Sequence, residues 1–274
     1  MQLHDGAWSL ALETPTIPPA TSTNTLVIGA DRLVVVEPAT PHPREQARLD
    51  TLLETLQAEG REVVALCLTH HHVDHIGHAK ALRERLGVPI LAHAETAARL
   101  PFAVDQTIDE GWSMELGGDM VVEAIATPGH APGHLLFWER SSRIGHAGDL
   151  VAGEGTILID VLDGGDMGVY LDSLRRMTAW CRERGGRLVP AHGAVLEDPV
   201  AVLEFYVRHR LEREERVRQA VQGGARDFQE ILAAAYADKP RAVWPMAAMA
   251  LEAHLRKLVA DGEMVRVGRG VDLV

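Results

Sequence analysis

The chain has few cysteines and few aromatic residues, and it has no long apolar run. Cys67 and Cys181 are its two cysteines, and they form no C-x-x-C spacing, so neither a disulfide framework nor a thiol redox site is expected. No stretch approaches the roughly 18 apolar residues of a membrane-spanning helix. Residues 1–20 contain Asp5, Glu13 and three prolines in place of the apolar core of a secretory signal. These absences predict a cytoplasmic protein without a membrane span.

The overall composition is that of a folded, acidic protein. Of 274 residues, 46% are hydrophobic and 24% are charged, and the formal net charge is −12. From Glu197 to Val274 there are 12 Lys and Arg against 13 Asp and Glu, so the acidic excess lies almost entirely in residues 1–196. Because nucleic-acid binders need basic surfaces to neutralise phosphates, this charge favours a small-molecule substrate over RNA.

Four histidines and an aspartate follow directly after the apolar run 63–68, which predicts a buried strand. Residues 69–75 are Thr-His-His-His-Val-Asp-His. His70 and His72 can point at one centre, whereas His71 alternates away from it. Asp74 and His75 follow as the chain enters a helix predicted over 76–86. Imidazole and carboxylate are the usual nitrogen and oxygen ligands of zinc-like ions, so the segment predicts a metal site.

Three further polar residues each follow an apolar run of their own. His130 lies in Pro128-Gly129-His130, Asp149 follows residues 143–148, and His192 follows residues 188–191. A histidine-rich surface loop would explain the first cluster by itself. It does not explain four predicted strand ends that together deliver seven candidate ligands.

These residues resemble the complete metal-ligand set of the metallo-β-lactamase superfamily, over residues from about 20 to 200. The set here is His70, His72, Asp74, His75, His130, Asp149 and His192. The resemblance implies an αβ/βα sandwich with its site along one edge of two packed sheets. It also implies that His70, His72 and His130 hold one divalent metal ion. Asp74, His75 and His192 would hold a second, and Asp149 would bridge both. Zn²⁺ is expected, and Mn²⁺ or Fe²⁺ accept the same donors.

Two such ions about 3.5–4 Å apart share a bridging hydroxide whose pKa is close to about 7, and this hydroxide is the expected nucleophile. Asp74, both ligand and proton acceptor, is the expected catalytic residue. His134 and Tyr170 are candidate substrate-binding residues, although a structural hydrogen bond is the stronger expectation for His134.

The remaining pattern predicts a layered α/β (α+β) fold, because strands alternate with helices. Strands are expected at 26–29, 33–36 and 90–92, helices at 46–59 and 171–184, and a loop over 160–172 that could rim the site. We therefore expect residues 1–198 to form the catalytic domain.

Residues 199–274 are expected to form a small winged-helix domain. Helices are predicted at 199–222, 228–236 and 245–260, followed by strands at 263–267 and 271–274 around Gly268-Arg269-Gly270. Arginines of the first helix alternate with glutamates, which predicts a solvated, self-paired face. This region, on residues 206–210 and 254–258, resembles the branch of the superfamily that includes β-lactamase-like protein 2.

The ligands predict hydrolysis but do not choose the substrate. The first hypothesis is a small ester or thioester, as in hydroxyacylglutathione hydrolases, although the C-terminal region differs from the glutathione-binding helices of that group. The alternative is an endoribonuclease acting on single-stranded RNA, which the winged-helix branch implies. The lack of a long inserted domain between Asp149 and His192 opposes this alternative. Lactone or β-lactam hydrolysis and a non-catalytic regulator are further alternatives, and the sequence leaves the oligomeric state open.

Overall fold

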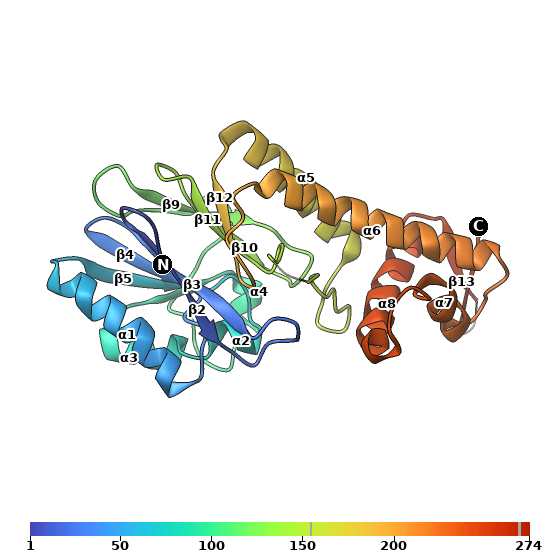
Figure 1. The fold of residues 1–274 in the computed structure, drawn as a ribbon, viewed down its shortest axis with the longest axis horizontal. Coiled ribbons are helices and arrows are strands. Elements are labelled where there is room, and N and C mark those ends of the chain that lie inside the picture. The colour runs from blue at the N-terminus through green and yellow to red at the C-terminus, as the bar shows by residue number, and fades with distance from the viewer. Residues whose placement is uncertain (154, 268–269) are drawn as a thin grey trace.

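Two β-sheets pack face to face, and helices cover their outer faces (Figure 1). The computed structural model describes residues 1–153, 155–267 and 270–274. The first sheet follows the chain order: β1 (Gln2–His4), β2 (Ala7–Glu13), β3 (Ser22–Ile28), β4 (Arg32–Val36), β5 (Glu62–Cys67), β6 (Ile90–Ala92) and β7 (Gln106–Thr107). The second sheet has the order β12 (Arg187–Pro190), β11 (Ile144–Gly148), β10 (Leu135–Glu139), β9 (Val121–Ala126) and β8 (Ser113–Glu115).

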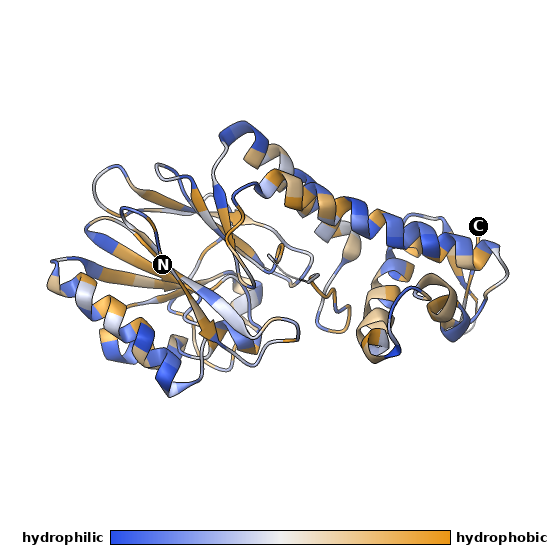
Figure 2. Ribbon diagram, in the orientation of Figure 1, coloured by the Kyte–Doolittle hydropathy of each residue, from blue (hydrophilic) through white to orange (hydrophobic). Residues whose placement is uncertain are grey.

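Strand β4 shows why both faces of the first sheet are covered. Leu33 and Val35 pack in the core beneath the outer helices, whereas Val34 and Val36 pack in the core between the sheets. All four side chains are fully buried. Because neighbouring side chains of a strand point to opposite faces, a continuous apolar strand needs a layer on each side. Apolar residues accordingly gather on the inner strands, and polar residues on the outer faces of the helices (Figure 2). The predicted layered α/β sandwich is confirmed.

Helices α1 (Pro43–Ala58) and α3 (Ala79–Leu86) cover the first sheet, and α5 (Met167–Arg184) and α6 (Pro199–Gln222) cover the second. Two single-turn helices lie in loops, α2 (Val73–Ile76) and α4 (Ala94–Ala97). The prediction of a single helix over 76–86 is wrong. The backbone N–H groups of Gly77 and His78 donate to the carbonyls of Ala39 and Pro38, at 2.9 Å each, so the chain leaves α2 before it begins α3.

The C-terminal unit consists of α7 (Phe228–Ala235), a 3₁₀ turn η1 (Arg241–Val243), α8 (Trp244–Ala260) and the ribbon β13 (Met264–Val267) and β14 (Gly270–Leu273). Asp227 caps α7 in a capping box with Glu230. Residues 268 and 269, which belong to the predicted connection Gly268-Arg269-Gly270, lie outside the described residues. No helix of the described residues has the length and apolar character needed to cross a membrane.

Helix α6 is shared by the two parts of the chain, and Figure 1 shows it running from one to the other. Leu203 and Tyr206 pack in the core under the second sheet, whereas Val217 and Val221 pack in the core of the C-terminal unit. The division into residues 1–198 and 199–274 stays a prediction, since α6 contributes to both cores.

The arginine-rich face of α6 is the predicted solvated, self-paired surface only in part. Arg208 and Arg216 are exposed, and Arg218 pairs with Glu214 and Glu215 of the same helix. Arg210 and Arg213 are buried, and Arg213 pairs with Asp238 at 2.8 Å rather than with a glutamate of its own helix. Helical spacing turns these two positions toward the loops and helices that pack on α6.

A buried ionic cluster joins α6 to α8, and we call it the Glu214 cluster. The Glu214 carboxylate accepts from Arg218 Nη2 at 2.7 Å and Lys257 Nζ at 3.1 Å, and its other oxygen lies 3.6 Å from His254 Nδ1. Burial opposes ionisation of Glu214, but His254 and Lys257 outweigh it and lower its pKa to about 2. The cluster therefore ties the long helix to the C-terminal unit.

Candidate metal centre

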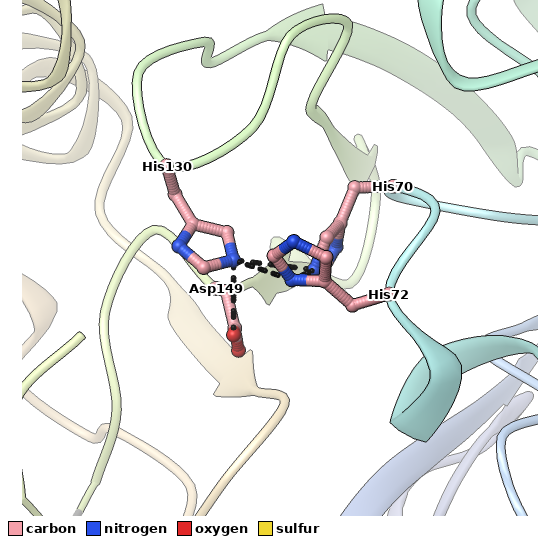
Figure 3. Close-up of side chains that lie close together, drawn as sticks. All are labelled: His70, His72, His130 and Asp149. Atoms are coloured by element: carbon pink, nitrogen blue, oxygen red, sulfur yellow. Dashed lines mark hydrogen bonds and ion pairs between the residues drawn. The ribbon is translucent and has the colours of Figure 1, made fainter. Parts of the chain in front are cut away.

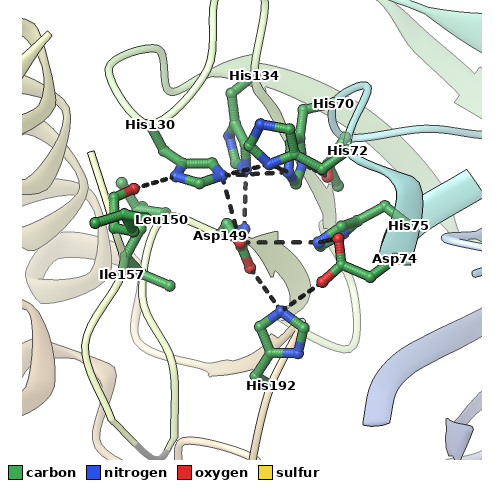
Figure 4. Close-up of polar contacts among 12 residues, drawn as sticks. His70, His72, Asp74, His75, His130, His134, Asp149, Leu150, Ile157 and His192 are labelled. Atoms are coloured by element: carbon green, nitrogen blue, oxygen red, sulfur yellow. Dashed lines mark hydrogen bonds and ion pairs between the residues drawn. The ribbon is translucent and has the colours of Figure 1, made fainter. Parts of the chain in front are cut away.

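The seven predicted ligands converge at one edge of the two sheets (Figure 4). They lie as follows: His70 and His72 after β5, Asp74 and His75 in α2, His130 between β9 and β10, Asp149 after β11 and His192 after β12. β5 belongs to the first sheet and the other strands to the second. The cluster therefore lies where loops from both sheets meet.

Three imidazoles and a carboxylate form the first group of donors (Figure 3). Nδ1 of His72 lies 3.0 Å from Nε2 of His70 and 3.0 Å from Nε2 of His130. The two Nε2 atoms of His70 and His130 are 3.3 Å apart, and Asp149 Oδ2 lies 3.3 Å from the latter. Three ring nitrogens and one oxygen thus face a common point.

The second group contains Asp74, His75 and His192. Nε2 of His75 lies 3.6 Å from Asp74 Oδ1, and Nε2 of His192 lies 3.6 Å from Asp74 Oδ2. Asp149 adjoins this group as well, because its Oδ1 lies 3.3 Å from His192 Nε2. Oδ2 of the same carboxylate lies 3.7 Å from His75 Nε2, so Asp149 faces both groups of donors.

Hydrogen bonds behind the rings decide which nitrogens carry hydrogen. Nδ1 of His130 meets the carbonyl of Leu158 at 2.8 Å, and Nδ1 of His192 meets that of Ser22 at 2.9 Å. A carbonyl oxygen only accepts, so Nδ1 of each ring donates and Nε2 of the neutral ring presents a lone pair to the cluster. Such partners are typical behind the histidine ligands of metals.

The inward lone pairs fit a cation. Burial and the neighbouring imidazoles lower the pKa of His70 and of His130 well below the usual value, so both rings are neutral at pH 7. Lone pairs 3.0–3.3 Å apart repel one another unless a positive charge lies between them. In the second group, His75 Nε2 and Asp149 Oδ1 are buried without a hydrogen-bond partner among the described residues. The donor set therefore fits two divalent ions.

Glu37 is a residue of this centre that the sequence analysis missed. It is fully buried, and its carboxylate accepts from Thr69 N at 2.7 Å and from His75 Nδ1. Burial opposes the charge on His75, but the carboxylates of Glu37, Asp149 and Asp74 outweigh it and raise the pKa of His75 to about 10. Glu37 directly follows the apolar strand β4, so the strand-end pattern that indicated the ligands also pointed to it.

Asp163 is a second residue that the sequence analysis missed, on the loop before α5. Its Oδ2 accepts from His72 Nε2 at 2.7 Å and from His71 Nε2 at 2.9 Å. Because the carboxylate takes the Nε2 hydrogen of His72, Nδ1 of that ring is free to face the first donor group. His71 thus faces a carboxylate beside the cluster and lies outside the seven donors. No local sequence signal identifies Asp163.

The two candidate substrate-binding residues are buried behind the site. His134 accepts from the backbone N–H of Asp149 at 3.0 Å and contacts Thr127 Oγ1 at 2.8 Å, and burial lowers its pKa to about 3. Tyr170 donates its hydroxyl to the carbonyl of Leu150 at 2.8 Å. Both side chains are fully buried, and their roles in substrate binding stay predictions. Both support the segment that carries Asp149.

Helix α6 supports the same segment. The hydroxyl of Tyr206 accepts from the backbone N–H of Ala152 at 3.0 Å, and Arg210 donates to the carbonyl of Ile157. The next carbonyl, that of Leu158, is the partner of His130 Nδ1. The long helix therefore holds the loop that orients one of the predicted ligands.

Stacked sheets with a two-part histidine and carboxylate cluster at their edge define a class, that of metal-dependent hydrolases with a layered α/β fold. The sequence model of the Metallo-beta-lactamase superfamily matches residues 18–179, and the chain belongs to that superfamily, whose members are generally hydrolytic enzymes. The model of the Beta-lactamase associated winged helix domain matches residues 228–271. The predicted family and the predicted winged helix are both confirmed.

The comparisons with individual proteins agree with this assignment. A "Beta-lactamase-like protein 2 homolog" from Drosophila melanogaster is 27% identical over 271 residues, covering 91% of this chain and 86% of the relative. A "Lactamase-like protein" from Penicillium aethiopicum is 31% identical over 227 residues, covering 80% of this chain and 66% of the relative.

Solved structures show the same fold over the whole length. A metallo-beta-lactamase family protein from Thermus thermophilus has a TM-score of 0.79 at 20% identity and covers 99% of this chain and 100% of that one. A beta-lactamase domain protein from Burkholderia ambifaria has a TM-score of 0.85 at 17% identity, with coverage of 100% and 93%.

Proposed function

We propose that this chain is a binuclear metal-dependent hydrolase that cleaves a small ester or thioester. The observation that carries the proposal is the position of Asp149, whose Oδ2 and Oδ1 lie 3.3 Å from Nε2 of His130 and of His192 respectively. In the proposal His70, His72 and His130 would hold one ion, Asp74, His75 and His192 would hold the other, and Asp149 would contribute to both. The ions are Zn²⁺, with Mn²⁺ or Fe²⁺ as alternatives, because these metals share nitrogen and oxygen donors.

When bound, the two ions supply a hydroxide nucleophile near neutral pH and polarise the carbonyl oxygen under attack. Asp74 is the proposed catalytic residue. Burial opposes ionisation of Asp74. The charges of His75 and His192 and a hydrogen bond from Thr16 outweigh burial and lower the pKa of Asp74. The carboxylate is therefore ionised at neutral pH, so that it orients the attacking water, accepts its proton and returns a proton to the leaving group.

The charge of the chain supports a small-molecule substrate. Residues 1–196 carry nearly all of the net charge of −12, and a negative surface repels polyanions. Cys67 and Cys181 are buried and free, which is consistent with the proposed cytoplasmic location.

Cleavage of single-stranded RNA is the second candidate function. It is favoured by the winged-helix match over residues 228–271, since this kind of unit is a frequent nucleic-acid binder. Lactone and β-lactam hydrolysis proceed by the same attack on a carbonyl carbon, so both kinds of substrate are included in the test.

The test is hydrolysis by the purified full chain loaded with Zn²⁺ or Mn²⁺, on an acyl thioester, a lactone, a β-lactam and a labelled single-stranded RNA. We expect turnover of the thioester and a loss of at least about 100-fold in His72→Ala, more than residues behind a ligand cause. His42→Ala is the control, because His42 is an exposed histidine far along the chain from the ligands.

Two results would contradict the proposal. If thioester hydrolysis survives in His72→Ala, the activity does not arise from this centre. If RNA is cleaved and the thioester is not, the second candidate function replaces the first.

A further inference from the structure

The segments around the metal cluster carry no lysine and no arginine. These segments either contain a predicted ligand or touch one, and they are residues 14–21, 68–78, 127–134, 149–166 and 191–198. Residues 14–21 belong to this set because Thr16 Oγ1 lies 3.5 Å from His192 Nε2. Sites for phosphates and carboxylates are normally built with arginine or lysine, because these side chains compensate the charge of the ligand. Such side chains are missing from the loops that a substrate must meet.

Arg99 and Arg210 contact the segment 149–166 from outside it, and both are engaged. Arg99 reaches toward Gly164, and its guanidinium is paired with the Glu95 carboxylate at 2.7 Å. Arg210 is buried and donates to the carbonyl of Ile157. Arg210 is therefore not placed to bind an anionic part of a substrate, and the charge of Arg99 is offset by that of Glu95.

Three exposed apolar side chains flank the same cluster. Ile17 is 53% exposed, Val73 is 67% exposed and Leu162 is 87% exposed. Ile17 follows Thr16, Val73 lies between the predicted ligands His72 and Asp74, and Leu162 precedes the carboxylate that holds His72.

The loops that carry two of these side chains also meet. Pro19 lies against Gly155, with its Cδ 3.4 Å from the place a Cβ would take. Single exposed apolar residues are common on proteins, so one of them would indicate nothing. Three of them beside one centre, on loops without a basic residue, indicate an apolar rim.

We infer that the substrate of this site carries an uncharged, apolar acyl group, which rests on the rim formed by Ile17, Val73 and Leu162. The inference rests on the proposed esterase or thioesterase function and names its substrate class. In the reaction, a water oxygen bonds to the acyl carbon and the C–S or C–O bond breaks. The leaving group takes a proton, and a fatty carboxylic acid is released. Each methylene that leaves water on the rim lowers the free energy of the transition state relative to free enzyme and free substrate, and so raises kcat/KM. Because the bound ester buries the same chain, the gain should appear mainly as a lower KM.

The experiment measures kcat/KM of the Zn²⁺-loaded full chain on thioesters of N-acetylcysteamine with acetyl, butyryl, hexanoyl, octanoyl and glutaryl groups. We expect kcat/KM to rise about two- to fourfold per methylene from acetyl to octanoyl. Glutaryl, which ends in a carboxylate, should be hydrolysed at least tenfold less efficiently than hexanoyl.

Variants of the rim test its residues directly. In Ile17→Ser and Leu162→Ser the ratio of octanoyl to acetyl kcat/KM should fall at least threefold. Leu162→Lys should raise the ratio of glutaryl to hexanoyl, because it adds the missing cation. Val265→Ser is the matched control: Val265 is an exposed valine on β13, in the C-terminal unit, and its loss should leave both ratios unchanged. The zinc content of each variant confirms that the centre is intact.

The outcomes separate the two claims. If all acyl groups react equally, or if glutaryl is preferred, the apolar-rim inference is wrong and the thioesterase function stands. If the serine variants keep the wild-type ratio, these side chains are not the rim. If no thioester is hydrolysed, the proposed function is wrong and the inference falls with it.

Discussion

The buried carboxylate of Glu37 accepts hydrogen bonds from two donors, and a glutamine in its place has one oxygen to accept them. Oε1 takes the backbone N–H of Thr69 at 2.7 Å, and Oε2 takes Nδ1 of His75. In Glu37→Gln the new NH₂ group faces one of these donors, whichever way the amide is turned. If it faces His75, the ring hydrogen moves to Nε2, the atom that points toward Asp149 and Asp74.

The expected cost follows from these contacts. One buried donor loses its partner, which costs about 1–3 kcal/mol of folding free energy. In either orientation the carboxylate charge behind His75 is lost, so the second metal ion should bind about 10- to 100-fold more weakly, the usual effect of removing the carboxylate behind a histidine ligand. Glu37 reaches the first donor group only indirectly, through its hydrogen bond to Thr69, the neighbour of His70. The metal affinity of the first group should therefore change less.

Metal stoichiometry and chelator competition measure this effect without any substrate. Wild type should bind two Zn²⁺ per chain, and Glu37→Gln should retain one tightly bound ion and lose the other during dialysis. Glu139→Gln is the matched control. Glu139 is also fully buried and accepts backbone N–H groups, from Val121 and Ser142, but it lies on β10 away from the ligands. Two ions of unchanged affinity in folded Glu37→Gln would refute the reasoning.

Three further substitutions test other parts of the structure. Asp163→Asn removes the carboxylate charge from the oxygen that accepts from both His71 and His72, so we expect the first donor group to bind Co²⁺ about 10- to 100-fold more weakly, as the visible absorption of the bound ion reports. An unchanged titration would contradict a role in orienting His72. Tyr206→Phe leaves the N–H of Ala152 without its acceptor and should lower the free energy of unfolding in urea by about 1–3 kcal/mol. A smaller change would mean that water replaces the hydroxyl. Glu214→Gln should lower the free energy of unfolding by about 3 kcal/mol at pH 7, because the folded pKa of about 2 lies below the unfolded value of about 4.3. This stabilisation is present above about pH 4.3 and is lost as the pH falls toward about 2. The free energies of unfolding of wild type and variant should therefore converge in acid.

The ligands could be predicted because their signal is local. Each one lies in a segment that follows an apolar strand, and the ends of neighbouring strands meet at one edge of a sheet, so residue type and position were enough. The carboxylate of Asp163 obeys no such rule. Asp163 reaches His72 across 91 positions of the chain, through a loop whose path depends on how Gly164 packs against Pro132. Only the folded chain shows that contact.

The burial of Tyr170 in a helix was not predicted, for a different reason. The helix was expected to begin at residue 171, which left Tyr170 in a loop beside the site. The structure begins α5 at Met167, with Asp166 as its N-cap. Met167, Tyr170, Leu171 and Leu174 then share one buried helical face at the spacing i, i+3, i+4, i+7. An N-cap recognised at Asp166 would have placed the tyrosine in the core.

The C-terminal unit has a structural role at the metal centre that does not require nucleic acid. Tyr206 and Arg210 of α6 hold the loop from Ala152 to Ile157, and the following carbonyl, of Leu158, fixes the hydrogen on His130. The far end of the same helix is fixed to α8 through the Glu214 cluster. A shift of the C-terminal unit would therefore move α6, release the loop and misorient a ligand. In the proposed function, this coupling would let a winged-helix unit with nearly balanced charge support the centre through its packing rather than through its surface.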